Sequence, residues 1–307
     1  MDKLLDVTLR EVSLATDYRI TVDEGLDLLT GLARTAIDIA EIGYFRPRLW
    51  DRVRSWESCP PEVLGKARAA LGDTQLSVFV HLGTVTAAEL AVLRDEGVDL
   101  VRVGIGPLTE ADRMRALAED LHRCGLPFSI NVIRASQRTL EDATALGRLA
   151  TETGARVLYF ADSNGALYTA RVAELIRAMQ AGTDVPLGLH AHDNLSLAFA
   201  NALIALEHGV SWLDSCLGGA GKGGGNLSTE RIALYLHSAG IRRFGLTTID
   251  DLSRSWLVPR QLDPPGFWEA VNGTLDLDME DCLRAGALHP DERAPHYQST
   301  YGLTLTT

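Results

Sequence analysis

Short apolar runs and longer amphipathic stretches alternate along the first 245 residues of the chain. Each apolar run has the length of a buried strand, and the stretches between them carry apolar residues at the spacing of one helix face. Several of these stretches end at a glycine, which suits the left-handed residue that follows many helices. The pattern predicts strands at 4–9, 36–43, 75–81, 98–104, 127–133, 155–161, 185–190 and 210–217, and helices at 22–35, 61–71, 87–95, 110–124, 140–153, 170–181 and 195–208.

Eight strands separated by helices predict an α/β fold, the closed parallel (β/α)8 TIM barrel, which typically takes ~250 residues. A doubly wound open sheet is the alternative. It would usually carry a glycine-rich loop after its first strand, and residues 8–12 contain no glycine. After residue 245 the pattern breaks into segments rich in proline and tryptophan. We therefore expect a barrel domain at 1–245 and a small, mostly helical C-terminal extension at 246–307, with a helix at 277–285 and a polar tail.

The composition limits the partners of the chain. It has 307 residues, of which 46% are apolar, and a formal net charge of −12. Such a charge repels nucleic acids and anionic membranes, so we expect neither as a partner. No apolar run reaches the ~18–20 residues of a membrane span, and no signal peptide pattern is present. The four cysteines lie far apart, which argues against a disulfide framework. We expect a cytoplasmic protein.

Two histidines end the seventh predicted strand, in Leu187-Gly-Leu-His-Ala-His192. Side chains alternate along a strand, so His190 and His192 should point to the same face. Imidazole is the commonest protein ligand for transition metals, which makes a metal site the functional interpretation. The structural alternative is a pair of histidines that bond to backbone carbonyls.

Further polar residues follow the other strands, where the active sites of TIM barrels lie. In Asp6-Val-Thr-Leu-Arg-Glu11 we expect Asp6, Thr8 and Arg10 on one strand face, with Glu11 joining them if the strand turns there. Glu11 and the two histidines form a mixed set suited to Mn²⁺, Zn²⁺, Fe²⁺ or Mg²⁺. Asp6 and Glu41 can serve as acidic partners of Arg10, and for Glu41 a structural ion pair is as good an interpretation as catalysis.

A glycine-rich run, Gly218-Gly-Ala-Gly-Lys-Gly-Gly-Gly-Asn226, follows the eighth strand. It is not a nucleotide P-loop, because Lys222 is followed by glycine instead of serine or threonine. Its glycines suit a loop that closes over a site and lets backbone amides approach an anion. Asn226 could reach the metal; for Lys222, an ordinary flexible loop is the alternative.

These motifs together resemble those of the DRE-TIM metallolyase superfamily, over roughly residues 4–240 and in the same order. The superfamily includes 4-hydroxy-2-oxovalerate aldolases, HMG-CoA lyase and isopropylmalate synthases. Tyr159-Phe-Ala-Asp-Ser-Asn-Gly-Ala166 and His192-Asp-Asn-Leu-Ser-Leu197 are most similar to the oxovalerate aldolase-like (HMG-CoA lyase-like) branch. The resemblance implies a metal on Glu11, His190 and His192, with Asn226 as a fourth ligand in some branches.

The resemblance also implies that Arg10 stabilises an enolate and that Ser163 holds the carboxylate of pyruvate. The chain departs from the aldolases at Leu14, where they place a histidine base, and from HMG-CoA lyase at Ala220, where that enzyme has a cysteine. The candidates for the base are then His81, Tyr44, His289, His296 and Tyr297. The whole predicted site comprises catalytic Arg10, Glu41, His81 and Tyr44, substrate-binding Arg10, Ser163, Asn131 and Asn164, and metal-binding Glu11, His190, His192 and Asn226.

We expect a metal-dependent aldolase or lyase that acts next to a 2-oxo acid, with Mn²⁺ before Mg²⁺, Zn²⁺, Co²⁺ or Fe²⁺ as the cofactor. The runner-up is a Claisen-type acyltransferase that joins a thioester to a 2-oxo acid. A metal-dependent hydrolase and a barrel without chemistry are further alternatives. We expect a homo-oligomer, specifically a dimer, and no dehydrogenase partner, because the C-terminal segment does not match the aldolase docking module.

Overall fold

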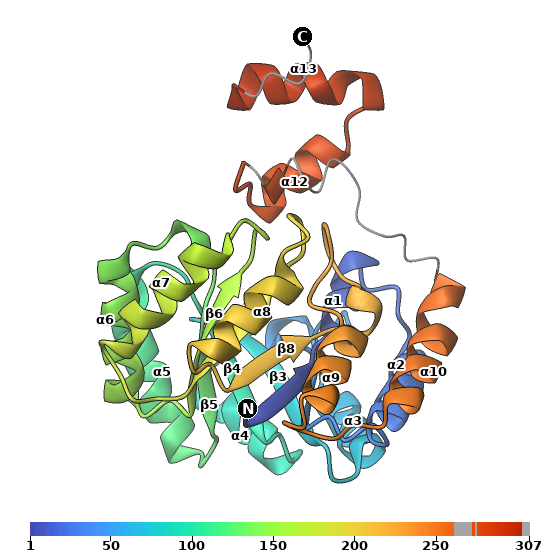
Figure 1. The fold of residues 1–307 in the computed structure, drawn as a ribbon. Helices are drawn as coiled ribbons and strands as arrows, with labels where there is room; N and C mark the ends of the chain where they lie inside the picture. Colours follow the sequence, from blue (N-terminus) through green and yellow to red (C-terminus); the bar gives the residue numbers. More distant parts are fainter. Residues whose placement is uncertain (261–271, 274, 303–307) are drawn as a thin grey trace.

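The barrel is closed and parallel, with eight strands paired in sequence order, which confirms the predicted (β/α)8 fold (Figure 1). The computed structural model describes residues 1–260, 272–273 and 275–302. The first strand pairs with both the second and the eighth, which closes the ring. The strands are β1 (Lys3–Asp6), β2 (Ile39–Tyr44), β3 (Gln75–His81), β4 (Leu100–Ile105), β5 (Phe128–Val132), β6 (Val157–Asp162), β7 (Leu187–Ala191) and β8 (Trp212–Ser215).

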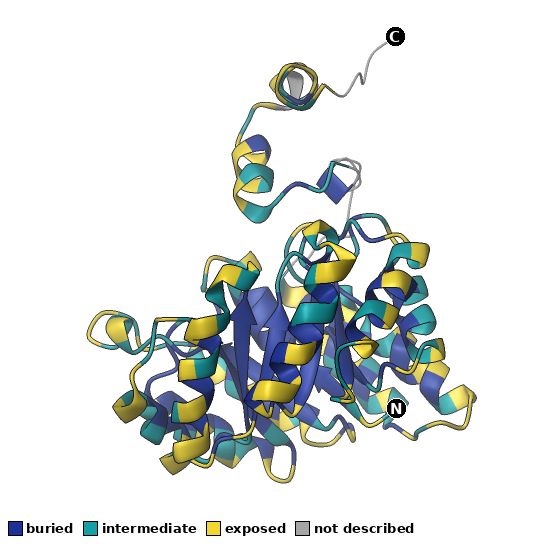
Figure 2. Cartoon of the chain, turned by 90° about the vertical axis from the view of Figure 1, so that its left-hand side faces the viewer, coloured by how far each residue is buried: buried dark blue, intermediate teal, exposed yellow. Residues whose placement is uncertain are grey.

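Helices surround the strands and bury their apolar faces against them, so that the strands are buried and the outer helix faces exposed (Figure 2). Three of these helices begin with a capping box, in which a threonine and an acidic residue three positions later satisfy each other's backbone N–H groups. The ring comprises α2 (Val22–Leu32), α3 (Pro61–Leu71), α4 (Ala87–Asp95), α5 (Ala111–Arg123), α6 (Leu140–Thr153), α7 (Thr169–Gln180), α8 (Ala198–Glu207) and α9 (Thr229–Ser238).

The prediction of a strand through residue 9 is wrong at its end. β1 stops at Asp6, and Thr8–Ala15 forms a separate helix, α1. The Asp6 carboxylate accepts hydrogen bonds from the backbone N–H and the hydroxyl of Thr8, at 2.9 and 2.8 Å, which holds the chain at this turn. Thr8 and Arg10 therefore do not alternate with Asp6 on a strand face. Arg10 and Glu11 lie on a short helix at the mouth of the barrel.

The C-terminal segment reaches the same mouth from outside. Helix α10 (Leu246–Leu257) packs beside α9 and α2, and α12 (Met279–Gly286) lies over the ends of the strands (Figure 1). Just before α12, the Asp276 carboxylate accepts hydrogen bonds from Asn164 Nδ2 at 2.6 Å and from Ser136 Oγ at 2.8 Å. The segment is thus fastened to the loops that follow β5 and β6.

The expected polar tail after residue 285 contains a further helix, α13 (Pro290–Tyr301). It lies beyond α12, away from the barrel, in both views of the fold (Figures 1 and 2). Tyr297 of α13 packs with Leu277 and Ala285 in a small cluster of its own. Within the described ranges, no helix combines the length and the apolar character that crossing a membrane requires.

Candidate active site

Three of the predicted metal ligands meet at the mouth of the barrel. One ligand atom each of Glu11, His190 and His192 can be chosen so that all lie within 4.8 Å of one another. The two Nε2 atoms of the histidines are 3.2 Å apart, and His190 Nε2 is 3.7 Å from Glu11 Oε1. Glu11 comes from α1. His190 lies on β7 and His192 directly follows it, so the alternation of side chains along the strand turns both imidazoles to the same side.

The protonation states of this cluster fit a cation. Burial would raise the pKa of Glu11, but the charges of Arg10, His192 and His190 outweigh it and lower that pKa to about 2. Burial lowers the pKa of His192 to about 4, so its imidazole is neutral at pH 7. Glu11 Oε2 and Asn226 Oδ1 are both buried and have no hydrogen-bond partner in the described part of the chain. Buried polar atoms seldom remain unpaired, so a divalent ion bound here would supply what they lack.

Asp214 of β8 orients one of the imidazoles, a role that sequence reasoning missed. Its Oδ2 lies 3.0 Å from His190 Nδ1 and 2.5 Å from Nη2 of Arg102 on β4. A hydrogen bond from Nδ1 leaves the lone pair of Nε2 for a metal, which is the usual arrangement around metal-binding histidines. The sequence signals for this pairing were a single charged residue in each of two strands, Arg102 in β4 and Asp214 in β8.

Arg10 and Arg102 continue this arrangement as a buried chain of alternating charges. Arg10 contacts Glu41 through Nε and Glu11 through Nη1, the latter at 2.6 Å. Arg102 Nη1 lies 3.3 Å from Glu41 Oε2. Glu41 sits behind Arg10, between the two arginines, and does not line the cavity that opens above these groups. Glu41 thus forms the structural ion pair with Arg10 that is one of its two expected roles. The carboxylates of Glu41 and Glu11 raise the pKa of Arg10, against the opposing effect of burial.

A cavity of about 190 Å³ opens above these groups; we call it the mouth cavity. It brings together residues from seven of the eight strands or the loops and helix that follow them, and Leu14, the position of the missing histidine, also lines it. The predicted site residues on its wall are Arg10, Glu11, Tyr44, His81, Asn131, Ser163, Asn164, His190 and His192.

Tyr44 and His81 form one side of the mouth cavity. Their rings stack with centroids 5.5 Å apart, and the Tyr44 hydroxyl lies 3.4 Å from Arg10 NH1. Partial burial of the ring, together with the charges of Arg46 and Arg10, lowers the pKa of His81, which keeps its imidazole neutral. Burial raises the pKa of Tyr44. The base candidates from the tail are not on the wall of this cavity: His289, His296 and Tyr297 belong to the segment beyond α12.

The three polar residues expected to bind substrate differ in their freedom to do so. The Ser163 hydroxyl accepts a hydrogen bond from the backbone N–H of Arg134 at 2.8 Å and retains its own proton for a ligand. Asn164 already donates to Asp276. With its amide oxygen facing Arg102, Asn131 accepts from Nε and NH2 of that arginine at 3.1 and 2.6 Å. Ser163 is therefore the one best placed to donate to a bound molecule.

The glycine-rich loop comes within contact distance of the metal cluster. A Cβ atom on Gly221 would lie 2.2 Å from Asn226 Nδ2 and 3.3 Å from Glu11 Oε2, so only glycine lets the backbone pass there. Asn226 Nδ2 donates to the carbonyl of Ala220 at 2.9 Å, and Asn226 pairs with His192 in an isolated β-bridge. Asn226 thus borders the cluster and keeps its Oδ1 available.

Comparisons with known proteins place the chain in a family. The HMGL-like family matches residues 86–255. A 4-hydroxy-2-oxovalerate aldolase from Roseiflexus sp. is 30% identical over 241 residues, which cover 78% of this chain and 71% of that protein. The oxaloacetate decarboxylase of Mycobacterium tuberculosis is 26% identical over 295 residues, or 92% of this chain and 86% of that one.

The solved structures provide a comparison of the fold. An HMG-CoA lyase from Bacillus subtilis superimposes with a TM-score of 0.73 at 18% identity, covering 88% of this chain and 97% of that chain. At this identity the likeness concerns the fold and not the chemistry.

Proposed function

The chain belongs to the HMGL-like family and is a metal-dependent carbon–carbon lyase, and we propose that its substrate is a 4-hydroxy-2-oxo acid, cleaved to pyruvate and an aldehyde. In the reverse direction it would join the same two molecules. The observation that carries this proposal is the meeting of Glu11, His190 and His192 beside the buried guanidinium of Arg10.

A divalent ion on these three ligands, which we propose to be Mn²⁺, with Mg²⁺, Zn²⁺, Co²⁺ and Fe²⁺ as alternatives, would polarise the keto oxygen of the 2-oxo acid. Asn226 Oδ1 is the proposed fourth ligand. Arg10 faces the same cavity and would stabilise the negative charge that develops on that oxygen. Glu41 holds Arg10 in place through its ion pair.

The remaining residues bind the substrate and move its proton. Ser163 would donate its hydroxyl proton to the carboxylate of pyruvate. In cleavage, a base takes the proton of the C4 hydroxyl, the C3–C4 bond breaks, and its electron pair passes to the pyruvate fragment as an enolate. The enolate then takes up a proton at C3 to give pyruvate. We propose His81 as this base, with the Tyr44 hydroxyl beside it, because both line the mouth cavity and His81 is kept neutral.

Exchange of the methyl protons of pyruvate for deuterium tests this proposal without requiring the aldehyde. We expect NMR to show exchange that depends on a divalent metal and stops after chelation. No exchange with any of the five metals would contradict the proposal. Release of thiol from acetyl-CoA in the presence of a 2-oxo acid would instead identify the Claisen-type acyltransferase.

Decarboxylation of oxaloacetate is a second candidate. It is favoured by the similarity to the Mycobacterium tuberculosis enzyme, which extends over 92% of the chain, whereas the aldolase match covers 78%. In that reaction the C3–C4 bond breaks, carbon dioxide leaves, and the same enolate takes up a proton at C3. Comparing the kcat/KM for oxaloacetate with that for 4-hydroxy-2-oxovalerate separates the two.

We also propose that the enzyme is a cytoplasmic homodimer without a dehydrogenase partner. Segment 246–307 would act as its C-terminal extension, in which α10 holds the segment to the outside of the barrel and α12 covers the mouth. Size-exclusion chromatography with light scattering tests the dimer.

A further inference from the structure

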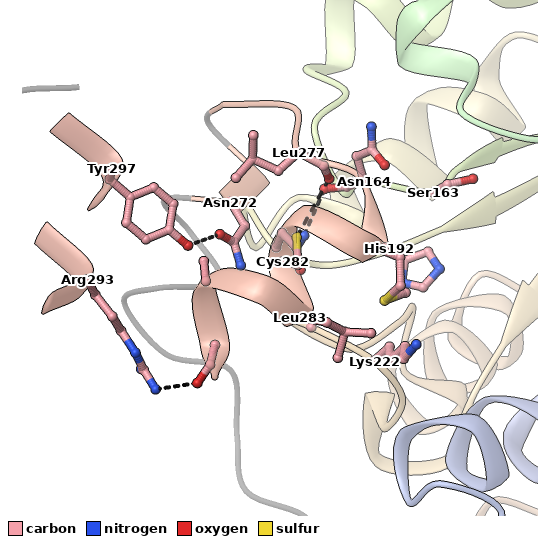
Figure 3. A pocket seen from close by; sticks show the side chains of 15 residues that line it. Ser163, Asn164, His192, Lys222, Asn272, Leu277, Cys282, Leu283, Arg293 and Tyr297 are labelled. Atoms are coloured by element: carbon pink, nitrogen blue, oxygen red, sulfur yellow. Dashed lines mark hydrogen bonds between the residues drawn. The ribbon is translucent and has the colours of Figure 1, made fainter. Parts of the chain in front are cut away.

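A second cavity, of about 330 Å³, adjoins the mouth cavity; we call it the side cavity. The two share the residues Ser163, Asn164, His192 and Met279 on their walls. The side cavity lies between the barrel and the C-terminal helices, with His192 and Lys222 on the barrel side and residues of α12 and α13 across from them (Figure 3). A molecule that reacts above His192 can therefore extend into this space.

The charge of the side cavity is opposite to that of the whole protein. The chain carries a net charge of −12, yet the described residues on this wall include Lys222 and Arg293 and no aspartate or glutamate. Arg293 donates to the backbone carbonyl of Gly286 at 2.9 Å, on the side of the cavity away from Lys222 (Figure 3). The side cavity is thus suited to an anion.

Lys222 is the residue best placed to bind that anion. It is one of the three lysines of the chain and is half-buried; the carboxylates of Glu11 and Asp17 act on its ammonium group from a distance, and no ion pair with it is formed among the described residues. It follows Gly221, whose backbone packs against the metal cluster, so its position relative to the reacting carbon is fixed by the loop. Leu277, Met279 and Leu283 supply apolar atoms to the wall of the same cavity.

We propose that the side cavity binds the aldehyde half of the substrate and that this aldehyde carries a carboxylate, held by Lys222. The inference rests on the proposed aldolase function and names the class of its second substrate. The aldehyde carbon would lie above His192, a short methylene chain would contact Leu277 and Met279, and the carboxylate would reach the ammonium group. A volume of about 330 Å³ is at the lower end of the ~300–1,000 Å³ of small-molecule sites, which suits a short chain.

The experiment compares two aldehydes of the same shape in the reaction with pyruvate: succinic semialdehyde and its uncharged isostere 4-methylpentanal. The wild-type kcat/KM for the charged aldehyde should be at least about tenfold higher, the effect of one partly buried ion pair. Lys222→Gln should bring the ratio of the two values close to one, Lys222→Glu should reverse it, and Lys222→Arg should restore most of it. Lys66→Gln, a change at an exposed lysine, is the matched control and should leave the ratio as it is.

The outcomes separate this inference from the function on which it rests. If the wild type exchanges pyruvate protons but shows no preference for the charged aldehyde, the inference is wrong and the proposed aldolase stands. A preference that persists in Lys222→Gln also overturns it. If no metal supports exchange, the proposed function fails and the inference falls with it.

Discussion

His190 Nδ1 lies 3.0 Å from Asp214 Oδ2, although the two residues are on different strands and 24 positions apart in the chain. Because the same oxygen of Asp214 also accepts from Arg102, one carboxylate is shared between the proposed metal ligand and a cation in the barrel interior. The orientation of the metal site is therefore tied to the core of the barrel.

Replacing Asp214 by asparagine should weaken metal binding by about 10–100-fold, the usual effect of losing the partner of a metal-binding histidine. Titration with Mn²⁺ followed by electron paramagnetic resonance measures the dissociation constant. The exposed Asp251→Asn variant is the control. An unchanged affinity would show that His190 needs no such partner.

His192→Ala should abolish stoichiometric metal binding, because it removes one of three ligands that meet within 4.8 Å. Asn226→Ala should cause a smaller loss if Asn226 is the fourth ligand. Metal content after dialysis, measured by mass spectrometry, checks both. His208→Gln, on the outside of the barrel, should retain the metal; full occupancy in His192→Ala would refute the proposed site.

Arg10→Lys should lower kcat/KM by about 10²-fold or more while the metal content is retained, because lysine keeps the charge but loses the planar fork of donors. Lysine is the better test than alanine, since an empty position would leave Glu41 and Glu11 unpaired and destabilise the fold. Arg19→Lys on the surface is the matched variant. Equal loss of metal and activity would assign Arg10 a structural role only.

The pH profile of pyruvate exchange should identify the base. His81 accepts a proton only when neutral, and its pKa lies below the usual 6.5, so the exchange rate should be constant above that pH and decline as the pH falls further. His81→Gln should lower the rate by about 10²–10⁴-fold and remove the acidic decline. A profile that instead rises at alkaline pH and is lost in Tyr44→Phe would assign the base to Tyr44, whose pKa is raised.

The contribution of Asp6 to the stability of the metal-free protein should decrease as the pH rises from about 4 to 7. Burial raises the pKa of Asp6 from 3.8 to about 7, against the lowering effect of its bonds with Thr8. Between these two values the carboxyl group is ionised in the unfolded chain but still protonated in the folded protein. The contribution of Asp6 to the free energy of unfolding is therefore fully present below pH 3.8 and is lost as the pH rises to 7, at up to about 1.4 kcal/mol per pH unit. Asp6→Asn should flatten this slope in urea unfolding, and exposed Asp73→Asn should not; identical slopes in all three proteins would contradict the shift.

The eight strands and the helices from α2 to α8 were predictable because their signals are local: each shows its own periodicity in the sequence. Helix α1 was not, because all of its residues from Thr8 to Ser13 are buried. Its polar residues Arg10 and Glu11 face the site instead of solvent, so they do not mark an exposed helix side, and its valine and threonine are typical of strands. Helix α13 was missed for the opposite reason, since its sequence is polar on most sides and contains Pro295.

The same distinction explains the site. His190 and His192 could be paired from the sequence because strand alternation fixes their relative direction. Arg102 and Asp214 are 112 positions apart, and nothing in either segment identifies the other as its partner. Their pairing follows only from closing the barrel.

The alternating charges of Arg10, Glu41, Arg102 and Asp214 also constrain how this protein can evolve. Each side chain is buried and neutralises its neighbours, so a single replacement leaves an unpaired charge in the buried interior. Relatives that lack one of these four residues should also differ at the residues paired with it. The four positions should therefore change together, and sequence variation at the mouth of the barrel should be concentrated in the surrounding loops.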